Sequence, residues 1–338
     1  MIHDRIPRSL PGAALAGAVL ALASCGGGSG SATGELTLGI TDAVVDDAEH
    51  VNVVFTGISL KPANGEPVTF LCDQPAGEPD FDCNGEGYRM IDLLELSGAK
   101  RAMLLEDITL VAGRYDWIRL LVNARGPGSS SLPYPDFPET NIVLKDNPDG
   151  PGEPLLIPSG PQTGLKLVGG FTVPSGGEAS FTIDFDLRKA VVKTEVGPLK
   201  EEKFLLRPAF RLVDDNNVGT LAGEVAPGFV LVPGDPATTV ADCDSPAVYV
   251  YEHEDDFVAG DLGSDNEPET TAYLVEPATG ASSSNYTYEV GFLEAGAYKV
   301  AVACGENDNT DVAGESIPMS ATKDADVTAG ETKRLNFF

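Results

Sequence analysis

Short runs of alternating apolar and polar residues, separated by turn-forming residues, dominate this chain and restrict it to a β architecture. The clearest run is residues 181–187, in which apolar residues alternate with Asp184 and Asp186. Successive side chains of a strand point to opposite faces, so this pattern predicts both carboxylates on the solvent side. Only residues 90–105 show helical or turn-rich character. Many short strands with Gly and Pro between them predict an all-β fold of antiparallel β-sandwiches.

The N-terminus has the pattern of a secretory signal. A basic start precedes an apolar run, residues 10–24, that is broken by Pro and Gly and is shorter than the ~20 residues of a membrane helix. The run ends in Leu22-Ala23-Ser24-Cys25, which resembles the lipobox of bacterial lipoproteins. In that family the signal is cut before the cysteine, whose sulfur takes a diacylglycerol. A buried or paired Cys25 is the alternative.

The lipobox predicts where the mature chain starts and where it lies. We expect a signal peptide over residues 1–24 and a lipidated Cys25 at the head of a flexible Gly/Ser tether over residues 25–34. The protein would then be anchored in a bacterial envelope through its lipid. Gly26 is what the sorting rules of that family associate with the outer membrane, on the periplasmic or the surface side.

Four further cysteines follow the tether. Outside the cytosol an even number of cysteines indicates disulfides, and local pairing is the most economical of three connectivities. The sequence therefore predicts the bridges Cys72–Cys83 and Cys243–Cys304. A zinc site is the competing interpretation, but the chain has no CxxC spacing and few histidines.

A change in charge and a cluster of turn residues divide the β region into two predicted domains. Asp214-Asp215-Asn216-Asn217 separates a domain over residues 35–215 from one over residues 219–338. Residues 219–338 contain 4 Lys+Arg against 22 Asp+Glu, whereas residues 25–218 contain 16 against 29. Clustered acids such as Glu252 and Glu254 predict a solvated, repulsive face.

The two predicted domains share a faint sequence echo. Leu110-Val111-Ala112-Gly113-Arg114-Tyr115 matches Leu293-Glu294-Ala295-Gly296-Ala297-Tyr298. Two related sandwiches in tandem would explain the match, and so would convergent hairpin chemistry.

Several motifs resemble a bacterial lipoprotein domain known as domain of unknown function 4382, over roughly residues 34–213. The motifs, in order, are Leu38-Gly39-Ile40-Thr41-Asp42-Ala43, Ile58-Ser59-Leu60-Lys61-Pro62, Ile91-Asp92-Leu93-Leu94, Gly113-Arg114-Tyr115, Gly164-Leu165-Lys166-Leu167 and Asp184-Phe185-Asp186-Leu187-Arg188-Lys189. The resemblance implies a secreted or lipid-anchored β domain and supplies no activity. Residues 219–338 are similar to transthyretin-like, carboxypeptidase-regulatory sandwiches, which implies a structural or adhesive accessory.

One acidic segment has the spacing of a metal-binding loop. Asp80, Asp82 and Asn84 alternate before Gly85-Glu86, as at the start of an EF-hand loop, but the twelfth position is Ile91. Two interpretations remain open. The simpler is an acidic surface loop closed by a disulfide, and the other is a weak calcium site formed by Asp80, Asp82, Asn84 and Glu86.

No catalytic signature is present. The mature chain has only His50 and His253 as imidazole bases, and neither lies in a recognisable motif. The formal charge of -30 argues against a nucleic-acid partner. We expect a non-enzymatic envelope protein that needs no cofactor and acts in binding, adhesion or surface assembly with an envelope protein or polysaccharide. The alternative is a carboxylate-based enzyme, or an enzyme accessory, acting on an extracellular polymer.

Overall fold

Strands whose apolar residues face one side account for the architecture of the chain. The computed structural model describes residues 31–43, 48–72, 81, 83, 86–158, 164–196, 201–254, 257–305 and 317–338. The predicted signal peptide and Cys25 lie outside the described residues. The fold class is all-β, as predicted, and helical structure among these residues is confined to four short turns.

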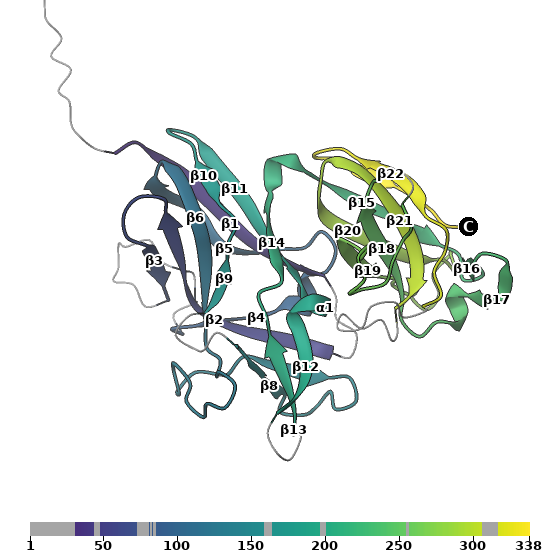
Figure 1. Cartoon of the computed structure of the whole chain (residues 1–338), viewed down its shortest axis with the longest axis horizontal. Helices are drawn as coiled ribbons and strands as arrows, with labels where there is room; N and C mark the ends of the chain where they lie inside the picture. Colours follow the sequence, from purple (N-terminus) through teal and green to yellow (C-terminus); the bar gives the residue numbers. More distant parts are fainter. Residues whose placement is uncertain are drawn as a thin grey trace, which may run out of the picture. The chain divides into compact units, whose positions relative to one another are not determined.

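Strands β1 to β14 form what we call the N-terminal sheets (Figure 1). One sheet has the order β14-β11-β1-β5, and the other follows the path β10-β6-β2-β7-β8-β13-β12, with β3 and β4 on β2 and β9 on β6. The strands are β1 (Thr33–Ala43), β2 (Ala48–Pro62), β3 (Val68–Leu71), β4 (Arg89–Asp92), β5 (Ala102–Val111), β6 (Gly113–Val122), β7 (Asn141–Leu144), β8 (Glu153–Leu156), β9 (Leu165–Leu167), β10 (Phe171–Val173), β11 (Glu178–Asp186), β12 (Val191–Val196), β13 (Glu201–Leu206) and β14 (Phe210–Asp214).

Strands β15 to β23 form the C-terminal sheets, again with two layers. A sheet of order β20-β15-β23 faces one of order β19-β18-β21-β22, and β16 pairs with β17. The strands are β15 (Val218–Val225), β16 (Val230–Val232), β17 (Asp235–Thr239), β18 (Pro246–Glu252), β19 (Thr270–Tyr273), β20 (Tyr286–Glu294), β21 (Gly296–Cys304), β22 (Lys323–Val327) and β23 (Thr332–Arg334). The helical turns are η1 (Leu93–Leu96), α1 (Leu187–Ala190), η2 (Asp215–Asn217) and η3 (Val240–Asp242).

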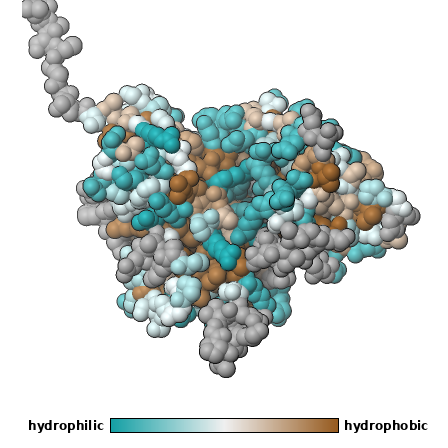
Figure 2. All heavy atoms as spheres, viewed as in Figure 1, coloured by the Kyte–Doolittle hydropathy of each residue, from teal (hydrophilic) through white to brown (hydrophobic). Residues whose placement is uncertain are grey.

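Each set of sheets encloses its own apolar cluster. Leu36, Phe55 and Phe185 belong to the cluster of the N-terminal sheets, and Val248 and Phe337 to that of the C-terminal sheets. The chain passes from one set to the other through η2, where Asp214 caps the turn by accepting a hydrogen bond from the Asn216 amide. On the face shown in Figure 2, hydrophilic residues cover much of the described surface and apolar residues lie in separate patches.

The two sets of sheets repeat one arrangement of strands. Strand β1 pairs antiparallel with β5 and parallel with β11, and β15 does the same with β20 and β23. The register also agrees. Thr33 lies opposite Val111 and Val218 lies opposite Glu294, and Val111 and Glu294 occupy equivalent positions in the two matched sequence segments. Convergent hairpins would not require the same parallel pair, so the sequence echo reflects an internal structural repeat.

A tyrosine fixes the hairpin in each repeat. The Tyr115 hydroxyl donates to the Val111 carbonyl at 3.0 Å, and the Tyr298 hydroxyl donates to that of Glu294 at 2.8 Å. Both rings are buried, and this burial raises the pKa of each phenol. A tyrosine four residues after its acceptor therefore explains why the two hairpins look alike in sequence.

A glycine at the start of each repeat allows a close backbone approach. A Cβ at Gly34 would lie 2.1 Å from the Pro174 carbonyl oxygen, and one at Gly219 would lie 2.4 Å from that of Thr328. Real side chains do not tolerate such distances, so glycine is required at both positions.

Two features of the fold differ from the sequence predictions. Three strand pairs, β1–β11, β8–β13 and β15–β23, are parallel, because long connections return the chain to the same edge in the same direction. Strand β11 ends at Asp186 and gives way to α1, which Asp186 caps by accepting a hydrogen bond from the Lys189 amide at 3.4 Å. Alternation alone predicts neither strand direction nor this helical turn.

Candidate functional site

The structure places the predicted site residues as follows. Disulfides join Cys72 to Cys83 and Cys243 to Cys304, the two local pairings predicted from the sequence. Asp80, Asp82 and Asn84 lie outside the described residues. Glu86 lies at the start of a turn, and its backbone amide donates a hydrogen bond to the Cys83 carbonyl. Among the described residues, no group of three or more His, Cys, Asp or Glu could hold a metal ion.

The histidines and the tryptophan lie apart from one another. His50 Nδ1 is 2.5 Å from an Asp92 carboxylate oxygen on β4, and His253 Nε2 is 3.9 Å from one of Asp324. Trp117 is half-buried on the outward side of β6, between the cations of Arg119 and Lys166.

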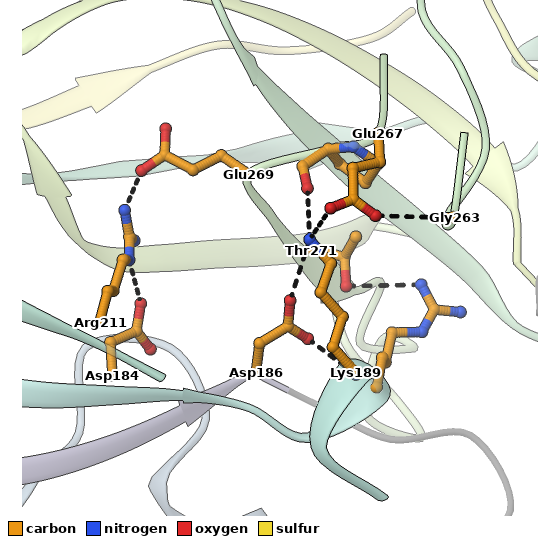
Figure 3. Close-up of polar contacts among 10 residues, drawn as sticks. Asp184, Asp186, Lys189, Arg211, Gly263, Glu267, Glu269 and Thr271 are labelled. Carbon is orange, nitrogen blue, oxygen red and sulfur yellow. Dashed lines mark hydrogen bonds and ion pairs between the residues drawn. The ribbon is translucent and has the colours of Figure 1, made fainter. Parts of the chain in front are cut away.

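A group of charged side chains, of which Asp184 and Arg188 are buried, lies where β11, α1 and β14 meet the C-terminal sheets. We call this group the junction cluster, and Figure 3 shows it. Its charged members are Asp184, Asp186, Arg188, Lys189, Arg211, Glu267 and Glu269.

Asp184 corrects the prediction that its side chain faces solvent. It is only 8% exposed, because the side of β11 that bears it is covered where β14 and the C-terminal sheets meet it. Arg211 lies opposite it on β14 and donates from Nε to an Asp184 oxygen at 2.8 Å. The same guanidinium also pairs with Glu269, before β19. Arg211 therefore bridges one carboxylate from each set of sheets.

Asp186 and Lys189 form a second bridge across the junction. Asp186 caps α1, and the Lys189 ammonium lies 3.6 Å from its carboxylate. The same ammonium donates to Glu267 Oε1 at 2.7 Å and to the Pro268 carbonyl at 3.3 Å. Glu267 also accepts a hydrogen bond from the Gly263 amide at 3.1 Å. Asp186 is thus withdrawn from the solvent face predicted for it.

Burial decides the electrostatics of the two aspartates. Burial raises the pKa of Asp184 above its usual range, and the adjacent Arg211 guanidinium lowers it by a smaller amount. Burial likewise raises the pKa of Asp186, against the attraction of Lys189. The cost of desolvating these carboxylates exceeds the gain from their cations, so the ion pairs do more to fix geometry than to add stability.

Arg188 inserts into the C-terminal sheets and is only 5% exposed. Its guanidinium donates to the Tyr249 hydroxyl at 3.0 Å, to the Thr271 hydroxyl at 3.4 Å and to the Gly305 carbonyl at 3.2 Å. It also lies 5.5 Å from the ring centroids of Tyr249 and Tyr273. A planar guanidinium suits this combination of stacking and several acceptors. Arg188 is thus an anchor of the junction.

Two hollows flank the junction cluster. A cavity of about 400 Å³ is lined by residues of both sets of sheets, among them Asp42, Lys100, Asp184, Tyr273 and Glu289. The lining combines two buried carboxylates, Asp42 and Asp184, with the aromatic ring of Tyr273. A second hollow of about 330 Å³ lies beside α1, and half of its lining residues are acids, namely Glu252, Glu254, Asp265, Glu267 and Glu269.

Sequence reasoning missed the junction cluster because the cluster exists only where two predicted domains meet. The signal that could have found it is the segment Asp184 to Lys189, in which two acids and two bases follow one another at the end of a strand. A solvent-facing strand end does not need charges of both signs. Aspartate is also one of the residue types typical of the N-cap of a helical turn.

The described residues contain no helix long and apolar enough to cross a membrane. No curated protein sequence matches the chain significantly.

Solved structures match the chain only distantly. A leucine-rich repeat protein from Bacteroides thetaiotaomicron has 13% identity and a TM-score of 0.19, and the alignment covers 90% of this chain and 26% of that one. A putative cell adhesion protein from Parabacteroides distasonis has 13% identity and a TM-score of 0.17, with 88% and 84% covered. One from Bacteroides fragilis has 10% identity and a TM-score of 0.19, with 89% and 91% covered. Scores this low carry no argument about function.

The family comparison is decisive. The profile of the family described as Domain of unknown function (DUF4382) matches residues 33–208, just over half of the 338 residues. The matched segment contains Asp184, Asp186, Arg188 and Lys189 of the junction cluster. The chain therefore belongs to the DUF4382 family.

Proposed function

We propose that this protein is a lipid-anchored component of a bacterial envelope and acts as a rigid, non-catalytic module for binding, adhesion or surface assembly. Cys25 would carry the lipid, and residues 26–34 would be the tether that holds the module away from the membrane. Two disulfides in the described sheets support a location outside the cytosol.

We further propose that residues 35–215 and 219–338 are two domains, the second of them transthyretin-like. Two separate apolar clusters and the repeated order of strands support this division. The contacts of the junction cluster then join two sandwiches that each have their own core.

The junction cluster is the observation that carries the proposed function. Its cations bridge acids of both sets of sheets, and Arg188 is buried among aromatic rings. Because these charged groups contact both sandwiches, they hold the two sandwiches in one orientation. Fixed surfaces favour binding, because less conformational freedom is lost when a partner associates.

Metabolic labelling with a fatty-acid analogue tests the anchor. The parent protein should be labelled and should fractionate with membranes, whereas Cys25→Ser should lose the label and appear as a soluble or unprocessed species. Cys72→Ser/Cys83→Ser is the matched control and should keep the label. Equal labelling of the parent and Cys25→Ser would remove the lipoprotein from the proposal.

The enzyme alternative has one observation in its favour. Asp42 and Asp184 are two buried carboxylates that line the cavity of about 400 Å³. Paired carboxylates in a cleft are what glycoside cleavage requires. Incubation with a panel of extracellular polysaccharides separates the two proposals, since we expect no turnover by the parent protein. Turnover that Asp42→Asn abolishes would establish the enzyme instead.

A further inference from the structure

A basic patch lies on the outward side of the N-terminal sheets, although the chain carries a formal charge of -30. Strand pairing places Lys61 opposite Trp117, and Arg119 opposite Lys166. These positions alternate along β6 with the buried Ile118 and Leu120, so their side chains point away from the core. We call the group of Lys61, Arg114, Trp117, Arg119 and Lys166 the basic face.

The side chains of the basic face are already held in position. The Arg119 guanidinium lies 4.8 Å, and the Lys166 ammonium 5.0 Å, from the centroid of the Trp117 ring. Among the described residues, the Nε of Arg119 has no hydrogen-bond partner. Tryptophan and arginine dominate the energetics of protein interfaces, and preorganised side chains lose less entropy on binding. The basic face therefore has the composition of an interface centre.

On β6 the basic face has one acidic neighbour. Asp116 is the acid that neighbours Trp117 along β6, and it lies 3.5 Å from Arg114. The face consequently keeps an excess of positive charge that a negatively charged partner could neutralise.

The C-terminal sheets offer a surface of opposite charge. We call the hollow lined by Glu252, Glu254, Asp265, Glu267 and Glu269 the acidic hollow. Lys189 pairs with Glu267 and Arg211 with Glu269. In the part of the chain that the structure describes, no lysine or arginine pairs with the other three acids. Tyr251 and Phe257 add apolar lining to the same hollow.

We propose that the basic face of one copy of this protein docks on the acidic hollow of a second copy. This docking rests on the proposed function, and a second copy of the protein is the binding partner. Because the two surfaces are different, the contact is head-to-tail and leaves one surface of each kind free at the ends. Such a contact propagates into an open chain of copies.

The net charge makes a specific prediction about salt. At about 10 mM salt the Debye length is about 30 Å, so the net negative charges of two copies repel one another over their whole width. At about 150 mM it is about 8 Å, which screens that repulsion more than it screens charges in contact. At 1 M the contacts are screened as well. Association should therefore be strongest near physiological salt and weaker at both extremes.

Sedimentation velocity at these three salt concentrations tests the proposal on the full mature chain in detergent. The parent should form concentration-dependent oligomers near 150 mM. Arg119→Glu/Lys166→Glu should raise the dissociation constant at least about tenfold, because like charges then meet in the contact. Lys333→Glu/Arg334→Glu makes the same change in charge on β23, away from both surfaces, and should associate like the parent.

A charge exchange makes the test independent of misfolding. Glu252→Lys/Glu254→Lys should also fail to self-associate, but its mixture with Arg119→Glu/Lys166→Glu should form mixed oligomers. A parent that stays monomeric at every salt concentration, or a mixture that stays monomeric, would overturn the proposal. So would binding of an anionic polysaccharide to the basic face without self-association. Fatty-acid labelling of Cys25 and the rigidity of the junction do not depend on these outcomes.

Discussion

Arg188 contacts the C-terminal sheets through three hydrogen bonds and two aromatic rings. Its position in the sequence does not predict these contacts. Arg188→Ala leaves the Tyr249 hydroxyl and the Gly305 carbonyl without their charged donor. Hydrogen bonds to charged groups are worth about 1.5–3 kcal/mol each, so we expect a loss of about 3 kcal/mol in the free energy of unfolding. Arg114→Ala removes an exposed arginine and should change it by less than about 0.5 kcal/mol. Urea unfolding measures both, and equal effects would show that Arg188 does not anchor the junction.

The raised pKa of Asp184 gives a pH dependence with a definite sign. Its pKa is raised above the ordinary value of 3.8 by burial, so the folded chain binds this proton more tightly than the unfolded chain does. The free energy of unfolding therefore falls as the pH rises from 3.8 through the folded-state pKa of this carboxyl. Asp184→Asn keeps an acceptor for Arg211 and removes the titration.

Urea unfolding between pH 4 and pH 7 checks this sign. The free energy of unfolding of the parent, relative to that of Asp184→Asn, should be larger at pH 4 than at pH 7. The opposite trend would mean that attraction to Arg211 outweighs desolvation.

Calcium binding by Asp80, Asp82, Asn84 and Glu86 stays a proposal from the sequence alone. Without a bidentate acid at the twelfth position, the dissociation constant should be on the order of 10⁻⁴–10⁻³ M. At about 100 times that constant, calcium would add roughly 2.7 kcal/mol of stability. The melting temperature should rise in calcium chloride and not in sodium chloride of matched ionic strength. Asp80→Asn/Asp82→Asn should lose the increment and Asp146→Asn/Asp149→Asn should keep it, whereas identical responses would eliminate the site.

At the scale of elements, alternation and turn residues predict the strands and leave their directions open. The all-β class and the disulfides Cys72–Cys83 and Cys243–Cys304 follow from the sequence, because alternation is a local pattern and each bridge joins two consecutive cysteines of the chain. The parallel pair β1–β11 could not be predicted, since it joins segments more than 130 residues apart. Nor could the burial of Asp184, which depends on the layer that covers β11.

The repeated hairpins predict paired effects of one substitution. Tyr115→Phe and Tyr298→Phe each remove a hydroxyl that bonds to a carbonyl four residues earlier. Each should cost about 0.5–1.5 kcal/mol in the free energy of unfolding, because each removes one partly buried hydrogen bond. Tyr286→Phe, at a half-buried position at the start of β20, should cost less. Thermal unfolding of the three variants checks the repeat, and a cost at only one of the two hairpins would contradict it.

At the scale of the whole molecule, charged side chains have different roles in different places. Paired charges in the junction cluster bridge the two sets of sheets. Among the described residues, Arg119 and Lys166 on the basic face and Glu252, Glu254 and Asp265 in the acidic hollow form no ion pair and remain available to a partner. The remaining excess of acids keeps the chain soluble and prevents indiscriminate contact.

Distance measurements between two spin labels test the rigid junction most directly. Labels at Glu106→Cys on β5 and Asp326→Cys on β22, in a soluble Cys25→Ser background, would report on the two sets of sheets. The account predicts one narrow distance distribution for this protein and for its Arg114→Ala variant, and a broad one for Arg188→Ala. A broad distribution in the parent, or the same narrow one in Arg188→Ala, would contradict it.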